Sequence, residues 1–390
     1  MKRNLILLYT IVFLQGMVFY GPVAVLYRQA AGITVFQMTL IEGISLVLTV
    51  GLEIPWGILA EKIGYRSTMV TCCIVFFISK IIFWQAVDFA GFLTERVLLA
   101  VVSAGLSGCD TALLYRSCRG EDTHWVFSLY SGLGLAGLLC SSCLYTLVVG
   151  ENFRLAGLLT VFSYGLAALA SLGLREVGEP EEEKEKKAPE KRSPVKAFRA
   201  ALWNPRLLLL LVAAALMEQT NWAVTVVLNQ LQYQRSGLEV SAMGVILAGV
   251  SLVGLLGVFS KKLTGRLGIL GTGELLFALT GGSCILLAVT AQPVVSILGI
   301  AVVSGAGALF TPLQTELQNR QVKTSQRATE LSIQSAFLNG AGALVSVAFG
   351  RAAEGSVPGA FLLGAACCVL GGLLYGVWCG KMRYKADNVH

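Results

Sequence analysis

The sequence predicts an all-α polytopic membrane protein with twelve transmembrane helices in two six-helix bundles. Of its 390 residues, 55% are hydrophobic and only 14% are charged, whereas a soluble domain needs about 25% charged residues to cover its surface. Its 43 glycines are typical of membrane helices that pack closely. Such a chain has too few charged residues to form a water-exposed surface, so most of its apolar surface must face lipid or other helices.

The apolar residues fall into stretches of the length that crosses a bilayer, about 20 residues each. The twelve predicted spans are residues 5–27, 36–59, 67–87, 91–113, 125–149, 153–174, 206–229, 241–260, 270–291, 295–317, 331–351 and 358–379. The first span follows Lys2 and Arg3 but is too long for a signal peptide and ends without a cleavage site. We therefore expect it to stay in the membrane.

The basic residues give the orientation of these spans. If the N-terminus is cytoplasmic, all of the 30 Lys and Arg lie in cytoplasmic segments except Arg28, Lys80, Arg96, Arg154, Arg235 and Arg351. This asymmetry is the positive-inside pattern, and one missing span would reverse every later loop. The pattern predicts a multi-pass protein of the cell membrane with both termini in the cytoplasm. It also explains the net charge of +7 without nucleic-acid binding.

One polar stretch divides the chain. Residues 176–204 contain three consecutive glutamates at 181–183, followed by many lysines, and several prolines, which is typical of a solvated linker. We predict an N-terminal six-helix bundle at 1–175, a charged cytoplasmic linker at 176–204 and a C-terminal six-helix bundle at 205–390.

The two halves share a short motif. Residues 57–66 read Gly-Ile-Leu-Ala-Glu-Lys-Ile-Gly-Tyr-Arg after span 2, and residues 257–266 run from Gly to Arg with the same spacing after span 8. Equivalent positions 200 residues apart indicate a duplicated six-helix unit. The Lys and Arg of each copy are expected to anchor a tight cytoplasmic turn.

The first copy of the motif resembles the loop signature between spans 2 and 3 of the major facilitator superfamily. It departs from the usual pattern by having Glu61 where Asp is common and Tyr65 where a basic residue is common, and the second copy lacks the acid. Residues 107–116 and 327–335 also look like segments of bacterial members with unassigned substrates.

The resemblance implies a carrier in which two bundles enclose one midplane site and open alternately to each side. Spans 1, 4, 7 and 10 would line the cavity. The motif would form a cytoplasmic gate that closes the inner side. We expect Glu61, Lys62 and Arg66 to make ion pairs or helix-end contacts there, together with Gly57, Gly64 and Asp110.

Ionisable residues within spans are costly and need a partner or a function. Glu42 and Lys80 lie at equal depth on neighbouring spans and are expected to form an ion pair. Span 7 has the densest polar cluster at membrane depth, from Glu218 to Trp222. We predict that Glu218 is the principal protonatable group and that it hydrogen-bonds to Gln15 in the other half. The alternative is a permanently protonated Glu218 in a helix interface.

Other polar and aromatic residues of the cavity-lining spans complete the predicted substrate and proton site. It comprises Glu218, Asn221, Trp222, Gln15, Phe19, Ser107 and Ser304. A serine in a membrane helix also commonly bonds to its own backbone, and that alternative applies to Ser107 and Ser304.

No other chemistry is indicated by the sequence. Ten cysteines lie mostly in apolar runs, as packing residues do, and two histidines lack metal-ligand spacing. We find no phosphate loop, nucleophile elbow or dinucleotide fingerprint. The sequence therefore predicts no metal, no cofactor and no enzyme.

The leading functional prediction is a monomeric, proton-coupled secondary transporter. The sparse, aromatic-rich lining favours export of a drug-like or metabolic compound. Gly132, Gly134 and Gly137 of span 5 lack the proline that many proton-driven exporters have there, which favours a plain packing face. The alternatives are a solute-uptake carrier and a non-transporting membrane sensor that binds a ligand without flux.

Overall fold

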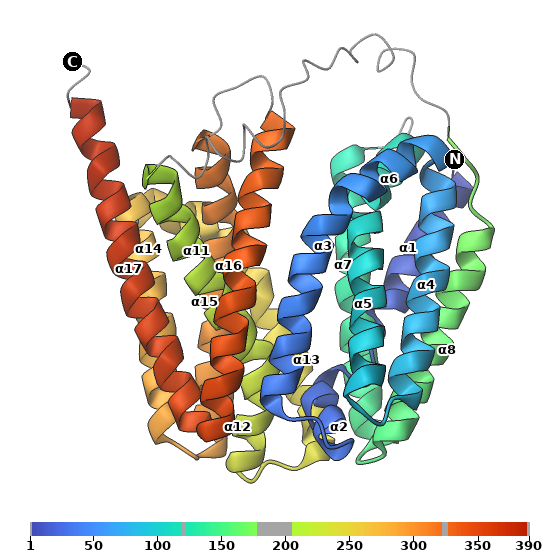
Figure 1. Cartoon of the computed structure of the whole chain (residues 1–390), viewed down its shortest axis with the longest axis horizontal. Coiled ribbons are helices and arrows are strands. Elements are labelled where there is room, and N and C mark those ends of the chain that lie inside the picture. Colours follow the sequence, from blue (N-terminus) through green and yellow to red (C-terminus); the bar gives the residue numbers. More distant parts are fainter. Residues whose placement is uncertain (1, 119–121, 178–204, 322–326, 388–390) are drawn as a thin grey trace. The chain divides into compact units, whose positions relative to one another are not determined.

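The computed structural model describes residues 2–118, 122–177, 205–321 and 327–387, and every regular element in those ranges is a helix (Figure 1). The predicted all-α class is therefore confirmed. Most of the predicted linker, residues 178–204, lies outside the described residues.

The predicted N-terminal half contains ten helical elements in the described ranges. They are α1 (Lys2–Gly16), η1 (Gly21–Val23), α2 (Ala24–Ala30), α3 (Val35–Ile63), α4 (Tyr65–Gln85), α5 (Phe89–Leu106), α6 (Cys109–Ser117), α7 (Thr123–Leu144), η2 (Tyr145–Val149) and α8 (Phe153–Leu172).

The predicted C-terminal half is built in the same way. Its elements are α11 (Pro205–Trp222), η3 (Ala223–Leu228), α12 (Asn229–Arg235), η4 (Val240–Ala242), α13 (Met243–Val253), η5 (Gly254–Phe259), α14 (Ser260–Val289), α15 (Pro293–Gln321), α16 (Arg327–Gly355) and α17 (Val357–Asp387).

Eleven segments of the described chain are long and apolar enough to cross a membrane. The longest, Val240–Val289, has 50 residues and includes predicted spans 8 and 9. The backbone leaves helical geometry at Gly268, with φ 72° and ψ 173°. Because only glycine adopts this conformation without strain, the turn between the two spans lies at Gly268. Gly268 lies in the predicted gap between spans 8 and 9, whereas residues 261–266 of the motif are themselves helical.

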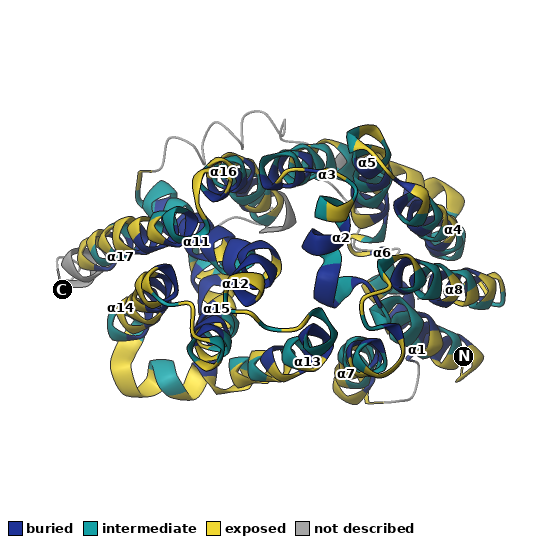
Figure 2. Ribbon diagram, turned by 90° about the horizontal axis from the view of Figure 1, so that it is seen from below, coloured by how far each residue is buried: buried dark blue, intermediate teal, exposed yellow. Residues whose placement is uncertain are grey.

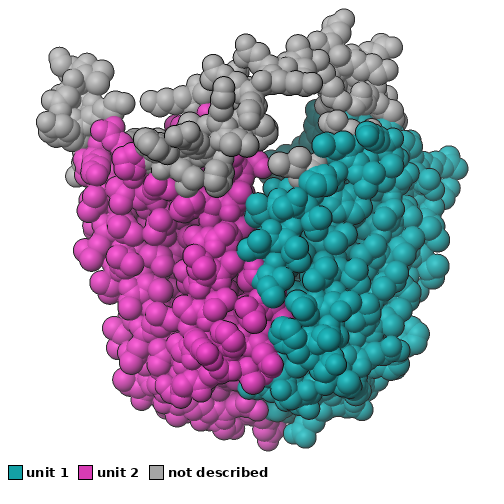
Figure 3. Space-filling view, viewed as in Figure 1, with its two compact units in different colours: residues 1–33, 44–190, 240–248 teal, residues 34–43, 191–239, 249–390 magenta. Residues whose placement is uncertain are grey.

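The chain folds into two compact units, coloured separately in Figure 3. Unit 1 contains residues 1–33, 44–190 and 240–248, and unit 2 contains residues 34–43, 191–239 and 249–390. The first turns of α3 thus pack with unit 2, where a Cβ on Gly350 would overlap Thr39. The start of α13 packs with unit 1, where the Val245 N–H donates to Thr146 Oγ1 at 3.1 Å. The predicted domain boundaries stay a prediction.

Each unit has its own apolar core (Figure 2). In unit 1 the core joins α1, α4, α6, α7 and α8 around fully buried residues such as Leu8, Ile11 and Leu113. In unit 2 it joins α11, α14, α15 and α17 around Leu210, Leu276 and other buried residues. α11 is the most completely covered span of the described chain, with 67% of its apolar window buried. A charged residue on α11 is therefore held in a well-packed frame.

Glycines bring α1 and α7 into close contact. A Cβ on Gly16 would overlap the carbonyl oxygen of Gly134, and a Cβ on Gly137 would overlap that of Phe13. Figure 2 shows the two helices side by side. The packing face predicted for span 5 is therefore present at Gly134 and Gly137, whereas a Cβ on Gly132 would meet no atom within 4 Å.

Gly137→Ala is expected to destabilise the protein by about 1–3 kcal/mol, because the added methyl group forces α1 and α7 apart. Gly132→Ala on the same helix is the matched control and should be neutral or stabilising by up to about 1 kcal/mol, since alanine favours the helix. Thermal unfolding in detergent measures both. Equal stability of the two variants would contradict the close contact.

Candidate functional site

The first span is broken within the membrane. The sequence predicts one span over 5–27, but α1 ends at Gly16, and helical structure resumes only at Gly21 as η1 and then α2. Pro22 accounts for the break, because it has no N–H with which to continue the hydrogen bonding of α1. The dipeptide Gly21-Pro22 was the sequence signal that could have revealed it.

Three hydroxyl groups of α8 satisfy the backbone groups at this break. Ser163 donates to the Leu14 carbonyl at 2.5 Å, and Tyr164 donates to the Gln15 carbonyl at 2.6 Å. The Phe19 N–H donates to the Thr160 hydroxyl at 3.0 Å. Residues 160, 163 and 164 share one helix face. Non-helical backbone at membrane depth is tolerated when the protein satisfies its polar groups, so α8 stabilises the break.

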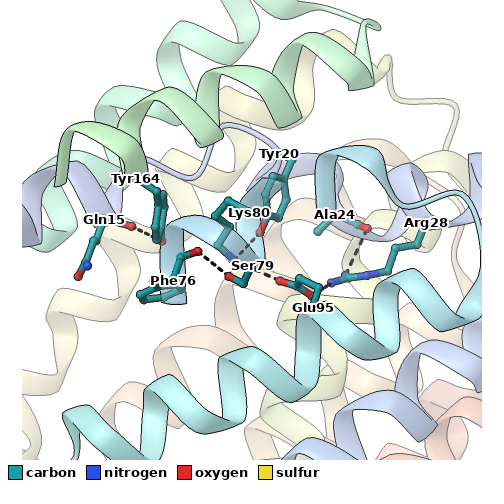
Figure 4. Close-up of polar contacts among 9 residues, drawn as sticks. All are labelled: Gln15, Tyr20, Ala24, Arg28, Phe76, Ser79, Lys80, Glu95 and Tyr164. Carbon is teal, nitrogen blue, oxygen red and sulfur yellow. Dashed lines mark hydrogen bonds and ion pairs between the residues drawn. The ribbon is translucent and has the colours of Figure 1, made fainter. Parts of the chain in front are cut away.

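A buried charge cluster follows the break (Figure 4). Lys80 of α4 donates to the Tyr20 hydroxyl at 2.9 Å and pairs with Glu95 of α5, Nζ to Oε1, at 3.2 Å. The other Glu95 oxygen lies 3.9 Å from the Arg28 guanidinium. The Lys80 and Glu95 side chains are only 4% and 1% exposed. Two cations therefore share one carboxylate inside unit 1.

Aromatic rings compensate for the second cation of this cluster. Lys80 Nζ lies 5.2 to 5.6 Å from the ring centroids of Phe76, Tyr164 and Tyr20. The Arg28 guanidinium lies 5.1 Å from the Phe83 centroid. The electron-rich faces of such rings attract cations, and more strongly where water is excluded. The cluster thus holds Tyr20 and the end of the break in a fixed place.

The carboxylate bonded to Lys80 is not the one that the sequence analysis chose. Equal depth on neighbouring spans predicts Glu42 as the partner of Lys80, whereas the structure gives Lys80 the carboxylate of Glu95. Glu42 lies in unit 2, and its pairing with Lys80 stays a prediction. Val87 lies in the turn between α4 and α5, and nearly equal numbers of residues separate it from Lys80 and from Glu95. This symmetry along the sequence was the signal that could have identified Glu95.

Glu218 lies on α11 in unit 2. Its neighbours Met217, Gln219 and Thr220 are buried in the packed part of the helix, whereas Glu218 is exposed. Gln314 of α15 provides a hydrogen-bond partner for the Glu218 carboxylate. The acid thus stands out from a well-packed helix, with one polar neighbour.

The remaining polar residues of α11 are tied to neighbouring helices. Asn221 donates to the Val303 carbonyl of α15 at 2.6 Å, beside half-buried Ser304. Gln219 accepts from Ser346 of α16 at 3.3 Å. Half-buried Trp222 ends α11, and a π-helical segment, η3, follows. Such wider turns are frequent at functional sites.

The predicted site residues of the first half lie in different environments. Gln15 donates to Cys73 Sγ at 3.5 Å, and Phe19 is buried. Ser107 is exposed in the turn after α5, because span 4 ends at Leu106 and Gly108 adopts φ 78°. Its predicted place at mid-depth was wrong. Gln15 and Glu218 belong to different units, so the predicted bond between them stays a prediction.

The predicted gate motif turns sharply at Gly64, where φ is 86°. The Arg66 N–H donates to Glu176 Oε2 at 3.1 Å, so Glu176 caps the start of α4. The Arg66 guanidinium donates to the Leu174 carbonyl at 2.7 Å. The turn is therefore attached to the segment after α8, and Glu176 and Leu174 are partners that the sequence analysis did not identify.

The remaining residues of the predicted gate are Gly57, Glu61 and Lys62 near the end of α3 and Asp110 on α6. Gly57 and Lys62 are exposed, and the Glu61 side chain lies outside the described part of the chain. Asp110 is the second residue of α6, which is not among the segments long and apolar enough to cross a membrane, and it accepts from the Thr111 N–H at 2.6 Å. Burial raises the pKa of Asp110 above its usual value. Ionisation of this group as the pH rises therefore costs folding stability.

Arg66→Ala is expected to lower both thermal stability and solute flux, because it frees the turn from the carbonyl of Leu174. Arg266→Ala is the matched control, since Arg266 holds the equivalent place in the second copy and is exposed. Glu176→Gln removes the charged cap of α4 and should cost about 0.5–2 kcal/mol. Wild-type melting and flux for Arg66→Ala would contradict this role.

Comparison with known proteins identifies the architecture. The sequence model of the Major Facilitator Superfamily matches residues 5–319. The nucleoside transporter NupG is 15% identical, with a TM-score of 0.79 over 97% of this chain and 99% of that one. A POT family transporter in complex with a thioalcohol-conjugated peptide is 16% identical, with a TM-score of 0.74 over 97% and 96%.

A third solved structure, a D-xylose–proton symporter, is 13% identical, with a TM-score of 0.73 over 96% of this chain and 97% of that one. At these identities the likeness shows the fold alone. No curated protein matches the chain by sequence.

Proposed function

Because this chain belongs to the Major Facilitator Superfamily of small-solute transporters, we propose that it is a proton-coupled secondary transporter that works by alternating access. The family makes the chain a transporter of small solutes rather than an enzyme. Proton coupling, the direction of transport and the residues of the site are the proposal.

The placement of Glu218 carries the proposal of proton coupling. Glu218 is the fourteenth residue of α11, it is exposed, and the neutral amide of Gln314 is its partner. No Lys or Arg follows Arg206 in α11. A carboxyl without a fixed cation on its own helix can exchange a proton at little electrostatic cost.

Export is the favoured direction, and uptake is the second candidate. In unit 1 the cations Lys80 and Arg28 are engaged by Glu95 and by aromatic rings. We infer that they do not bind an anionic solute, which favours a poorly hydrated solute. Uptake is supported by the proton symporter among the structural neighbours. The proposal further includes a monomer in the cell membrane with both termini in the cytoplasm.

Flux measurements with purified protein in liposomes test the function. A ligand-stabilisation screen of nucleosides, short peptides, pentoses and amphiphilic aromatic compounds first selects solutes that raise the melting temperature. A proton antiporter accumulates the selected solute in liposomes with an acidic interior, and a proton symporter does so with an acidic exterior.

The outcomes separate the candidates. Accumulation that follows the sign of the pH gradient supports proton coupling and gives the direction. Solute flux that does not depend on the pH gradient would contradict proton coupling and would indicate a uniporter. A solute that binds but never crosses, in protein whose orientation and folding are verified, supports the membrane sensor.

A further inference from the structure

A cavity of about 280 Å³ lies between α14, α15 and α17 of unit 2. Its lining residues are Ile269, Leu270, Leu317, Arg320, Gln321, Trp378 and Cys379. Most of these side chains are apolar, and the cavity reaches the surface at Arg320, whose side chain is 58% exposed. The volume is slightly below that of sites for drug-sized ligands, so it fits one part of a larger amphiphile.

Trp378 lines this cavity, and its indole N–H is an unused hydrogen-bond donor. The residue is 2% exposed, and its Nε1 has no hydrogen-bond acceptor among the described residues. A buried donor without a partner costs about 1–3 kcal/mol, so such groups usually mark an absent ligand or water. The indole is held by packing on Tyr375, whose hydroxyl donates to the Ile269 carbonyl at 2.9 Å.

The depth of Trp378 matches the membrane interface. It is 21 residues after Val357, the first residue of α17, and a helix of that length spans about 32 Å, close to the hydrocarbon thickness of about 30 Å. The indole N–H therefore lies at the level of lipid ester and phosphate groups, where tryptophan is typically found.

Positive charge gathers at this end of unit 2. Five exposed cations lie on α14, α15 and α17, namely Lys261, Lys262, Arg266, Arg320 and Lys381. The acids on the same elements near the cavity are Glu274 and Glu316, and Glu316 pairs with Arg320. Basic pockets between membrane helices at the interface favour anionic lipid head groups.

We propose that this cavity binds one anionic phospholipid from the adjoining leaflet. An ester or phosphate oxygen accepts from Trp378 Nε1, the upper part of an acyl chain occupies the space beside Ile269 and Leu317, and the head group lies next to Arg320. The site is separate from Glu218 and independent of the solute that is transported.

The test measures the phospholipid that remains on the full-length protein. Protein is equilibrated with equal amounts of phosphatidylglycerol and phosphatidylcholine, and the bound lipid is counted by native mass spectrometry and by the shift in melting temperature. The wild type should retain phosphatidylglycerol preferentially. Trp378→Phe should lower that retention about tenfold, the effect of one hydrogen bond to a charged group. Trp125→Phe, an exposed tryptophan of α7, is the control.

Three further variants change the charge without touching the core. Arg320→Gln should remove the preference for the anionic lipid, whereas Arg266→Gln, outside the cavity lining, should retain it. Glu316→Gln should raise phosphatidylglycerol retention because it releases Arg320 from its ion pair. Equal binding of both lipids by the wild type, or unchanged retention in Trp378→Phe and Arg320→Gln, would overturn the proposal whether or not solute transport is found.

Discussion

Glu218→Gln is expected to abolish proton-driven accumulation of the solute while preserving the fold. Glutamine retains the shape and the hydrogen-bonding ability toward Gln314 but cannot titrate. Coupling between two ligands, here the proton and the solute, typically changes the affinity for each by about 5–150-fold. The variant should lose this coupling. Solute affinity, measured between pH 5.5 and 8, should become independent of pH, whereas exchange of solute without a gradient should continue.

Glu354→Gln is the control for this prediction. Glu354 is an acid at the far end of α16 that pairs with Arg351 at 3.3 Å, outside the proposed site. Its variant should accumulate solute as the wild type does. If Glu218→Gln still concentrates solute against a gradient with the normal pH response, Glu218 is structural and the proton acts elsewhere.

Removing one charge from the Lys80–Glu95 pair is expected to destabilise the protein by about 3–5 kcal/mol, because the other charge is then stranded in a dry interior. Glu95→Gln should lower the stability of the protein more than Lys80→Met does. The first leaves Lys80 and Arg28 together without a carboxylate, whereas the second leaves Glu95 with Arg28 at 3.9 Å. The double variant should be more stable than Glu95→Gln alone.

Thermal unfolding of the two single variants and the double variant gives the coupling energy of the pair. The exposed pair Arg320–Glu316 serves as the control, since its side chains are 58% and 54% exposed. Surface pairs contribute only about 0–1 kcal/mol, so its variants should melt close to the wild type. Additive losses from Lys80→Met and Glu95→Gln would show that the two residues act independently.

The class of the protein could be predicted from the sequence because composition and span length are constrained by the bilayer itself. Stretches of about 20 apolar residues can satisfy their backbone only as helices. The short motif from Gly57 to Arg66 then carried the family resemblance, which the match over residues 5–319 confirmed. Neither inference depends on which helices are neighbours in the fold.

The partners of individual polar residues could not be predicted in the same way. Depth along two spans suggested Glu42 for Lys80, but depth does not determine which face of a helix meets which neighbour. The structure brings Glu95 to Lys80 because α4 and α5 are antiparallel neighbours on either side of one short turn. For the same reason no specific partner could be named for Arg66, whose guanidinium donates to the carbonyl of Leu174, 108 residues away.

The sequence by itself determined that this chain is a helical membrane transporter, and it singled out the acid of span 7, because hydrophobicity and charge are properties of single segments. Only the tertiary structure decided where the first span breaks and how the break is stabilised. A broken helix at membrane depth depends on hydroxyl groups from α8 and on the close approach of α7 at Gly137. Such contacts join residues more than 100 positions apart, and no local pattern specifies them.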